Sequence, residues 1–245
     1  MIEEKNYSEY IRSTVLSNAG FDPGEAAAQK LAEFTGILIE ENEKYNLTAI
    51  KDPEKIALLH VADSLTAAKY IPEGSCVCDV GAGGGFPSLP LAVCRPDLRV
   101  TALDATAKKT QFLKNTAEKL GISNLTAING RAEEIFACGE HARETFDVVT
   151  ARAVAPAGIL SELCAPALKR GGLFIMMKGD KAEEELADSA SGLKRLGLSL
   201  KVKITLQLCS AEELINRYII IFEKYSNTDK AYPRRYAQIK SKPLF

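Results

Sequence analysis

Histidine is scarce in this chain of 245 residues, and its cysteines show no metal-binding pattern. Only His60 and His141 are present, too few for a histidine-rich metal centre, and the six cysteines lack the paired spacing of zinc sites. Core packing or chance exposure explains the cysteines better than a disulfide framework does. We therefore expect no metal site and a reducing compartment for this protein.

Long apolar segments are also missing. No run approaches the roughly 18 residues that a membrane-spanning helix requires, and the first residues, Met-Ile-Glu-Glu-Lys, are acidic and contain no signal-peptide core. Apolar residues make up 46% and charged residues 26% of the chain, as in ordinary soluble globular proteins. These features predict a cytoplasmic protein without membrane contacts, and nothing in them indicates more than a monomer.

A net charge of −1 does not suggest a nucleic-acid-binding protein, but the charges are unevenly distributed. Residues 1–46 hold nine acids and four bases, whereas residues 224–245 hold six bases and one acid. The bases at this end are Lys224, Lys230, Arg234, Arg235, Lys240 and Lys242, with Tyr225, Tyr232 and Tyr236 among them. Bases interleaved with aromatic rings suit a phosphate backbone and stacked nucleobases, although a solvated basic tail explains them equally well.

The most informative segment is Cys76-Val77-Cys78-Asp79-Val80-Gly81-Ala82-Gly83-Gly84-Gly85-Phe86. An apolar run that ends in an acid and glycines, followed by an apolar stretch at 88–94, predicts a strand, a tight turn and a helix. No lysine follows the glycines, which excludes a P-loop. Phe86 occupies the place where a dinucleotide fingerprint needs a small residue. A loop that wraps a compact cofactor such as S-adenosylmethionine remains.

From residue 75 onward, short β-rich runs alternate with helical stretches, which predicts a parallel, doubly wound α/β sheet. The expected strands are 76–80, 100–104, 125–128, 146–150, 173–177, 199–206 and 218–222. Helices are expected at 88–94, 108–120, near 133, at 159–168 and at 181–196. A short connection joins the last two strands, so we expect them to pair antiparallel. A parallel sheet closed by an antiparallel pair is typical of class I methyltransferases.

The first 70 residues are predicted to be helical. Asp22-Pro23 and Asp52-Pro53 each read as a helix start, with an acid at the N-cap and proline at the first helical position. We therefore predict three parts: a helical cap over residues 1–72, a methyltransferase domain over 73–225 and a basic tail over 226–245.

Candidate cofactor residues follow the predicted strands at the edge where open α/β sheets bind ligands. Asp104 ends the second strand and can accept hydrogen bonds from both ribose hydroxyls, with Ala105 and Thr106 beside the adenosine. Glu133, in Gly130-Arg131-Ala132-Glu133, is placed to meet the adenine edge. The same carboxylate also suits the first turn of a helix for electrostatic reasons alone.

Two basic residues end later strands. Arg152 follows the fourth strand amid small and apolar residues, where an unpaired charge is costly. Its position favours contact with the cofactor carboxylate or the substrate over a purely structural ion pair. Lys178 ends the fifth strand and can meet a phosphate, or it can be structural.

Motifs of other methyl-transfer chemistries are absent. The fourth strand continues as Ala-Arg-Ala-Val and not as the Asn/Asp-Pro-Pro-aromatic loop used for exocyclic amines. Cys164, predicted inside a helix, is not placed as the nucleophile that pyrimidine C5 methylation needs. A ring nitrogen such as guanine N7 needs neither device, because it has a free lone pair and no proton to lose, and alignment suffices.

Taken together, the motifs resemble the ribosomal RNA small-subunit methyltransferase G family, also called the glucose-inhibited division protein B family. The resemblance covers nearly the whole chain. It is carried by Asn46-Leu47-Thr48, His60-x-x-Asp63-Ser64-Leu65, Asp79-Val80-Gly81-x-Gly83-x-Gly85-Phe86-Pro87, Leu89-Pro90-Leu91-Ala92, Leu103-Asp104-Ala105, Lys108-Lys109, Phe112-Leu113, Gly130-Arg131-Ala132-Glu133, Arg152-Ala153, Met177-Lys178-Gly179, Tyr232-Pro233-Arg234-Arg235 and Lys242-Pro243-Leu244.

The resemblance implies N7 methylation of a guanine in 16S rRNA, free or within the small ribosomal subunit, with S-adenosylmethionine as cofactor. By motif position, the cofactor would contact Gly81, Phe86, Asp104, Ala105, Thr106, Ala132, Glu133 and Arg152. Arg152 would act at the methyl-transfer end without a general base, and Lys178, Arg234 and Arg235 would bind RNA. Two other hypotheses are a nicotinamide-dependent oxidoreductase, disfavoured by Phe86, and a non-catalytic RNA-binding module. The roles of Asn46, His60 and Asp63 stay open between a cap over the site and interhelical hydrogen bonding.

Overall fold

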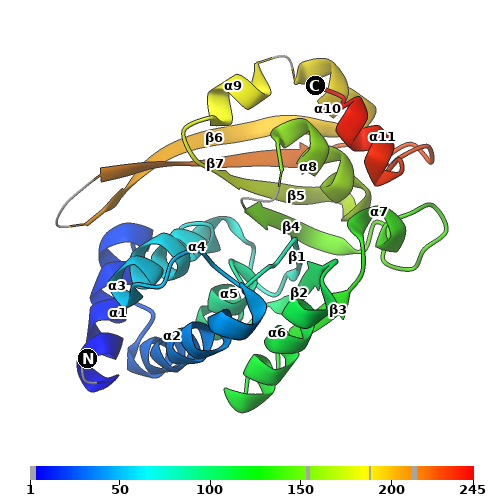
Figure 1. Ribbon diagram of the computed structural model, residues 1–245. Helices are drawn as coiled ribbons and strands as arrows, with labels where there is room; N and C mark the ends of the chain where they lie inside the picture. Colours follow the sequence, from blue (N-terminus) through cyan, green and yellow to red (C-terminus); the bar gives the residue numbers. More distant parts are fainter. Residues whose placement is uncertain (1–3, 153–154, 188, 211–213) are drawn as a thin grey trace.

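A computed structural model describes residues 4–152, 155–187, 189–210 and 214–245. Its centre is a seven-stranded sheet with helices on both faces (Figure 1). Ala153, part of one family motif, lies outside the described residues. Within the described ranges, no helix has the length and hydropathy needed to cross a membrane.

The sheet has the order β3-β2-β1-β4-β5-β7-β6. Strands β1 to β5 run parallel, and β7 pairs antiparallel with both β5 and β6. The strand bounds are β1 Cys76–Val80, β2 Arg99–Asp104, β3 Leu125–Asn129, β4 Phe146–Arg152, β5 Leu168–Lys178, β6 Leu198–Cys209 and β7 Leu214–Lys224. The predicted parallel sheet closed by an antiparallel pair is therefore confirmed.

Two sets of helices cover the sheet. Before β1 come α1 Glu4–Ala19, α2 Glu25–Tyr45, α3 Pro53–Ile56, the π-helix η1 Ala57–Ala62, α4 Asp63–Leu65 and the short η2 Ala68–Tyr70. Between and after the strands come α5 Ser88–Cys94, α6 Ala107–Lys119, α7 Ala132–Ile135, α8 Ala157–Cys164, η3 Ala165–Ala167, α9 Ala182–Leu186, α10 Ala190–Arg195 and α11 Tyr236–Ser241. The single helix predicted at 181–196 is wrong, because two short helices occupy that range.

Alternate residues of the central strands face two separate hydrophobic clusters, as the two-residue period of a strand requires. Val77 and Val148 pack with the N-terminal helices, α5 and α6, while Cys78 and Val149 pack with α7, α8 and α10 on the other face. Both faces are apolar, which explains why these strands read as continuous hydrophobic runs.

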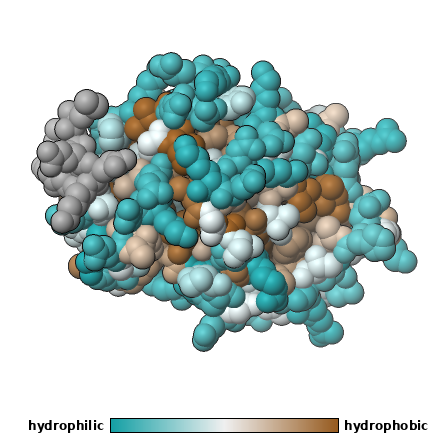
Figure 2. All heavy atoms as spheres, turned by 90° about the horizontal axis from the view of Figure 1, so that it is seen from below, coloured by the Kyte–Doolittle hydropathy of each residue, from teal (hydrophilic) through white to brown (hydrophobic). Residues whose placement is uncertain are grey.

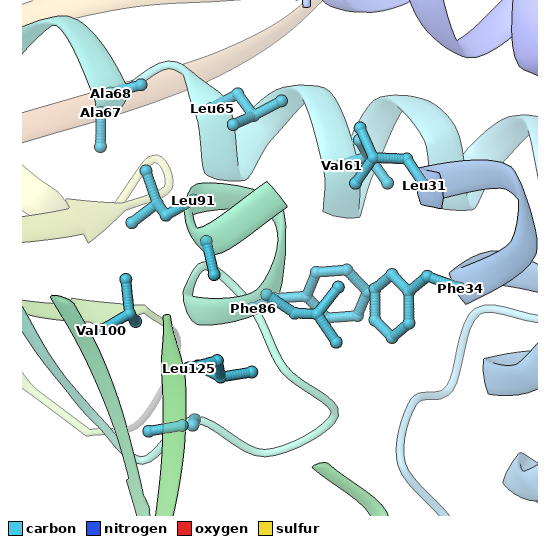
Figure 3. Close-up of a cluster of buried hydrophobic side chains, with 14 of the residues drawn as sticks. Leu31, Phe34, Val61, Leu65, Ala67, Ala68, Phe86, Leu91, Val100 and Leu125 are labelled. Carbon is cyan, nitrogen blue, oxygen red and sulfur yellow. The ribbon is translucent and has the colours of Figure 1, made fainter. Parts of the chain in front are cut away.

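The N-terminal helices share the first hydrophobic cluster with the sheet. Figure 3 shows Phe34 of α2 and Phe86 of the glycine loop side by side, with ring centroids 5.3 Å apart. Leu31 lies on the same helix, and Val61 and Leu65 come from the helices above it. This packing fixes the glycine loop against α2, so the N-terminal helices help to form the site beside it.

The basic segment 224–245 is largely packed onto the protein. Lys224 is fully buried and donates hydrogen bonds to the Ala165 carbonyl and the Thr228 hydroxyl, so its expected place in an exposed basic surface is wrong. Burial lowers the pKa of Lys224 to about 8. In α11, Ile239 is buried against the α8 side of the sheet.

Candidate functional site

The glycine loop turns sharply after β1, at the carboxyl edge of the parallel strands. Gly81 and Gly83 have φ values of 79° and 56°, which side chains with a Cβ rarely adopt. The amides of Gly81 and Ala82 donate to the Leu103 carbonyl of β2 at 2.8 and 3.0 Å. The turn is thus fixed by the neighbouring strand, and its open side faces a cavity.

Beneath this loop lies Asp79, a completely buried carboxylate. It accepts hydrogen bonds from the Ser88 amide at 3.1 Å and from the Thr150 hydroxyl at 3.2 Å, which joins β1 to α5 and β4. Burial raises the pKa of Asp79 to about 6, against the hydrogen bonds that lower it. The support of the glycine loop therefore contains a group that titrates just below neutral pH.

Replacing Asp79 by asparagine tests this burial cost. The folded pKa of Asp79 exceeds its unfolded value, so it contributes stability below pH 4 that is lost as pH rises to about 6. Asparagine cannot ionise, and its amide can still accept from the Ser88 amide and donate to the Thr150 hydroxyl. We expect the free energy of unfolding of Asp79→Asn, relative to wild type, to rise by about 3 kcal/mol between pH 4 and pH 7. Urea unfolding of both proteins between pH 4 and pH 7 measures this difference. If their free energies of unfolding changed in parallel with pH, the prediction would be wrong.

Asp104, at the end of β2, is predicted to bind ribose. Its carboxylate accepts from the Gly83 amide at 2.9 Å and from the Thr106 amide at 2.8 Å. Each carboxylate oxygen has a second lone pair, so both can still accept a hydroxyl proton from the cavity. The structure thus holds Asp104 in place through the two segments that flank the predicted cofactor.

The cavity beside the glycine loop, here called the loop cavity, has a volume of about 340 Å³. Four of the predicted cofactor residues line it: Gly81, Phe86, Asp104 and Arg152. It is also lined by residues for which no cofactor contact was predicted: Leu47, His60, Ala82, Gly83, Gly84 and Lys109. Sequence reasoning missed Leu47 and Lys109 as lining residues, because only tertiary packing brings them to the loop.

The remaining predicted cofactor residues lie outside the lining of the loop cavity. Ala105 and Thr106 are exposed and follow Asp104 directly. Ala132 is buried, and Glu133 is bound to Arg131 at 2.5 Å between side-chain atoms. Arg131 in turn lies over the ring of Tyr236, 5.1 Å from its centroid. The adenine-side role of these residues stays a prediction.

Arg152 ends β4 and joins two N-terminal helical turns. Its guanidinium donates to the Leu59 carbonyl at 2.9 Å, to the Asp63 carboxylate at 3.0 Å and to His60 Nδ1 at 3.1 Å. It also lies 5.3 Å from the ring centroid of Phe86. The structural ion pair considered for Arg152 is therefore present, with Asp63 as its partner, and the residue lines the loop cavity as well.

His60 connects this cluster to the chain after α2. Its ring stacks on Phe86 with centroids 4.5 Å apart, and its Nε2 lies 2.7 Å from the Thr48 hydroxyl. Because Arg152 can only donate, Nδ1 is the acceptor and Nε2 carries the proton. Burial, with Arg152 and Arg217 nearby, lowers the pKa of His60 to about 3, so the ring is neutral at pH 7.

The turn that presents Thr48 depends on Asn42, which sequence reasoning missed. Asn42 accepts from the amides of Leu47 and Thr48 at 2.7 and 2.9 Å and donates to the Thr48 carbonyl. Asn46 closes α2 in the left-handed conformation, with φ of 51°. The Asn46-Leu47-Thr48 motif is thus a helix end that places Leu47 and Thr48 at the site.

A second cavity of about 340 Å³, here called the cationic cavity, lies next to the first. Its lining includes Arg152, Lys178, Arg217 and Asp63, of which Asp63 alone is acidic. His60 and Arg152 are the two residues that line both cavities. These two side chains therefore lie at the boundary where the two cavities adjoin, here called the wall.

Arg217, on β7, was missed by sequence reasoning. Its Nε lies 3.3 Å from the Asp63 carboxylate, which thereby joins two arginines from separate strands. Lys178, predicted to bind RNA, donates to Glu185 at 2.7 Å and to the Ala155 carbonyl at 2.6 Å. No local pattern marked Arg217, because its partner Asp63 is 154 positions away in the sequence.

The two predicted RNA-binding arginines of the tail lie elsewhere. Arg234 forms two side-chain hydrogen bonds, of 2.8 and 2.6 Å, to the fully buried Glu162 of α8. Arg235 is exposed, and neither residue lines the loop cavity or the cationic cavity. The structure thus does not bring these arginines together with Arg152.

Comparison with known proteins gives a consistent result. The model of the family described as rRNA small subunit methyltransferase G, GidB, matches residues 27–211. Ribosomal RNA small subunit methyltransferase G of Lactobacillus acidophilus is 41% identical over 235 residues, which cover 94% of this chain and 96% of that protein. The protein of the same name from Bacillus cereus is 42% identical and covers 91% of this chain and 92% of its own length.

Solved structures share the fold at low sequence identity. The YcgJ protein from Bacillus subtilis has a TM-score of 0.52 and 16% identity, covering 69% of this chain and 100% of that one. M. jannaschii TYW2, solved in complex with AdoMet, has a TM-score of 0.52 and 16% identity, covering 66% of this chain and 76% of that one. These similarities confirm the methyltransferase fold expected from the sequence.

Proposed function

Because the chain belongs to the rRNA small subunit methyltransferase G family, we propose that it transfers a methyl group from S-adenosylmethionine to guanine N7 in 16S rRNA. One observation carries this proposal beyond the family name. His60 and Arg152 line both the loop cavity and the cationic cavity, so a cofactor in one and a nucleotide in the other would approach each other beside these two side chains.

The loop cavity suits S-adenosylmethionine in the chemistry of its lining. Asp104 keeps free lone pairs for two ribose hydroxyls, and a Cβ at Gly83 would meet no side chain, so a ligand can approach its backbone. Gly85 serves packing instead, because a Cβ there would lie 2.8 Å from Leu113. The bound cofactor supplies the electrophilic methyl group, and these residues orient it toward Arg152.

The cationic cavity suits a nucleotide because bases outnumber acids around it. Arg152 and Arg217 share the carboxylate of Asp63, and Lys178 is bound to Glu185. Arg217 keeps donors of its guanidinium for a phosphate, while its Nε holds it on Asp63. We propose that Arg217 and Lys178 bind the backbone of the target nucleotide and leave the base free to reach the wall.

The chemistry at the wall needs no general base. Guanine N7 has a lone pair and loses no proton when it gains a methyl group. His60 is neutral at pH 7 and its Nδ1 is occupied by Arg152, so its function is to hold that guanidinium. The protein then contributes alignment of the nitrogen with the methyl group and the exclusion of water.

Methyl transfer from labelled S-adenosylmethionine to small-subunit rRNA tests the proposal. We expect one labelled guanine and depurination behaviour typical of N7-methylguanine when the site is mapped. Label on an exocyclic amine, or no transfer to either free 16S rRNA or the small subunit, would disprove it.

Replacing Asp104 by alanine tests the cofactor site. The change removes the predicted acceptor for two hydroxyls and releases the Gly83 and Thr106 amides from the carboxylate. Hydrogen bonds to a charged group contribute about 1.5–3 kcal/mol each, so we expect the Kd of S-adenosylmethionine to rise about 100-fold or more. Titration calorimetry measures this affinity. The matched control is Asp97→Ala, whose carboxylate binds Arg95 outside both cavities and should leave the Kd within about twofold.

A further inference from the structure

The outer side of α2 and the end of α6 form a groove that the proposed methyl transfer does not use. One hollow of about 690 Å³ lies against Ala32, Gly36 and Ile39 of α2, and a second of about 170 Å³ lies against Tyr45 and Phe112. Both are lined by Ile37, Glu40 and Lys119, so they continue into each other. We call the combined feature the α2–α6 groove.

The groove has an apolar floor and an acidic rim. Figure 2, which looks onto the α2 and α6 side of the molecule, shows hydrophobic side chains at the surface among hydrophilic ones. Glu33, Glu40 and Glu41 line it against one base, Lys119. Glu33 and Glu40 form no ion pair within the described ranges, and the first 46 residues carry five more acids than bases. Phosphates are repelled by such a rim, whereas basic side chains are attracted.

A buried hydroxyl gives a second, independent sign of a ligand. Thr116 of α6 is 1% exposed, and its Oγ1 has no hydrogen-bond partner among the described residues. It lines the smaller hollow next to Asn115. An unpaired buried hydroxyl costs about 1–3 kcal/mol, and a polar group that widens the hollow slightly as it binds would recover that cost.

The shape fits a helix. Ala32 and Gly36 are one helical turn apart, and a Cβ added at Gly36 would meet no atom within 4 Å, so another backbone can approach closely. From Ala32 to Tyr45 the groove follows α2 for about 20 Å at 1.5 Å per residue, the length of three to four turns. Amphipathic helices bind such grooves through apolar residues at i, i+3, i+4 and i+7.

We propose that the α2–α6 groove binds a basic amphipathic helix of a protein in the small ribosomal subunit. This inference rests on the proposed function, whose 16S rRNA is the RNA of the small ribosomal subunit. The small subunit contains RNA and RNA-binding proteins, and the positive charge of those proteins complements the acidic rim of the groove. The groove would add affinity for the assembled particle while the cationic cavity binds the nucleotide.

Charge reversal in the groove separates protein contact from RNA contact. Glu40→Arg and Gly36→Arg place a cation in the groove, and Glu43→Arg is the matched control, exposed on the same helix but outside the lining. We expect the first two variants to weaken binding to purified small subunits at least 10-fold in cosedimentation. Binding to 16S rRNA stripped of protein should stay within twofold or become tighter, because an added cation attracts phosphate. The control Glu43→Arg should weaken binding neither to small subunits nor to stripped 16S rRNA.

Two results would overturn the proposal: wild-type binding of Glu40→Arg to subunits, or equal losses for subunits and stripped rRNA. A photo-crosslinking phenylalanine analogue at position 119, which lines both hollows and leaves Gly36 and the acidic rim unchanged, identifies the partner after irradiation with subunits. An adduct to a subunit protein supports the proposal, whereas an adduct to rRNA, or none, refutes it. Both measurements record binding without methyl transfer, so their failure is distinct from a failure of the proposed activity.

Discussion

Replacing Arg152 by methionine should lower kcat for methyl transfer at least 100-fold, about 2.7 kcal/mol in the barrier. Methionine keeps an unbranched apolar stem beside Phe86 but removes the donors to Leu59, His60 and Asp63. The wall between the two cavities then loses the group that orders it. Single-turnover kinetics with labelled cofactor and rRNA measures the step, and cofactor affinity is recorded in parallel.

A stability loss alone could mimic this result, because Asp63 is 6% exposed at its side chain and would keep only Arg217. Removing one partner of a buried ion pair is destabilising by about 3 kcal/mol. The double variant Asp63→Asn with Arg152→Met removes the orphaned charge and should recover most of the free energy of unfolding. We expect its methyl transfer to stay low. If activity returned with stability, Arg152 would be a structural residue only.

The strands of the sheet and their parallel or antiparallel direction could be predicted because local signals agree with the tertiary structure there. Strands β1 to β4 begin and end within two residues of the bounds that their apolar runs predicted. The Asp52 cap also agrees, since its carboxylate accepts from the Lys55 amide at 2.8 Å. Where a strand is buried on both faces, its sequence alone is a sufficient signal.

Other elements depended on contacts that no local pattern reveals. The predicted cap at Asp22 is wrong: Gly24 caps α2, and Asp22 pairs with Arg12 instead. Strand β5 begins at Leu168 and not at residue 173, because Phe146 pairs with Leu168 across a bulge. Gly171 and Gly172 lie inside this strand although glycine has low strand propensity, because strand pairing outweighs that propensity.

The residues of the site also divide into predictable and unpredictable ones. The glycine loop follows β1 and Asp104 ends β2, so the sequence could predict that they lie close together. The Asp63 cluster joins a helix to β4 and β7, and the π-helix η1 that precedes Asp63 carries Leu59 and His60. Unusual helix geometry at functional positions cannot be read from hydrophobic period. The partners of Arg152 and the role of Arg217 were therefore out of reach of sequence reasoning.

The second large effect is expected at the tail. Arg234→Met should lower the free energy of unfolding by about 3–4 kcal/mol, because it leaves the fully buried carboxylate of Glu162 without its counter-charge. The Arg234 main-chain amide, 2.9 Å from the same carboxylate, would be its remaining partner there. Urea denaturation at pH 7 measures the loss, and the double variant with Glu162→Gln should recover much of it.

Variants of Arg234 and Arg235 decide what the tail contributes to RNA binding. A base that neutralises one phosphate adds about one to the salt slope of RNA binding. Arg235 is exposed, so Arg235→Ala should reduce that slope by about one without changing stability. Arg234 is held by Glu162, so in the stabilised Arg234→Met, Glu162→Gln protein the slope should equal that of wild type. A reduced slope in that protein would mean that Arg234 leaves Glu162 to contact RNA, and the predicted RNA-binding role of Arg234 would then hold.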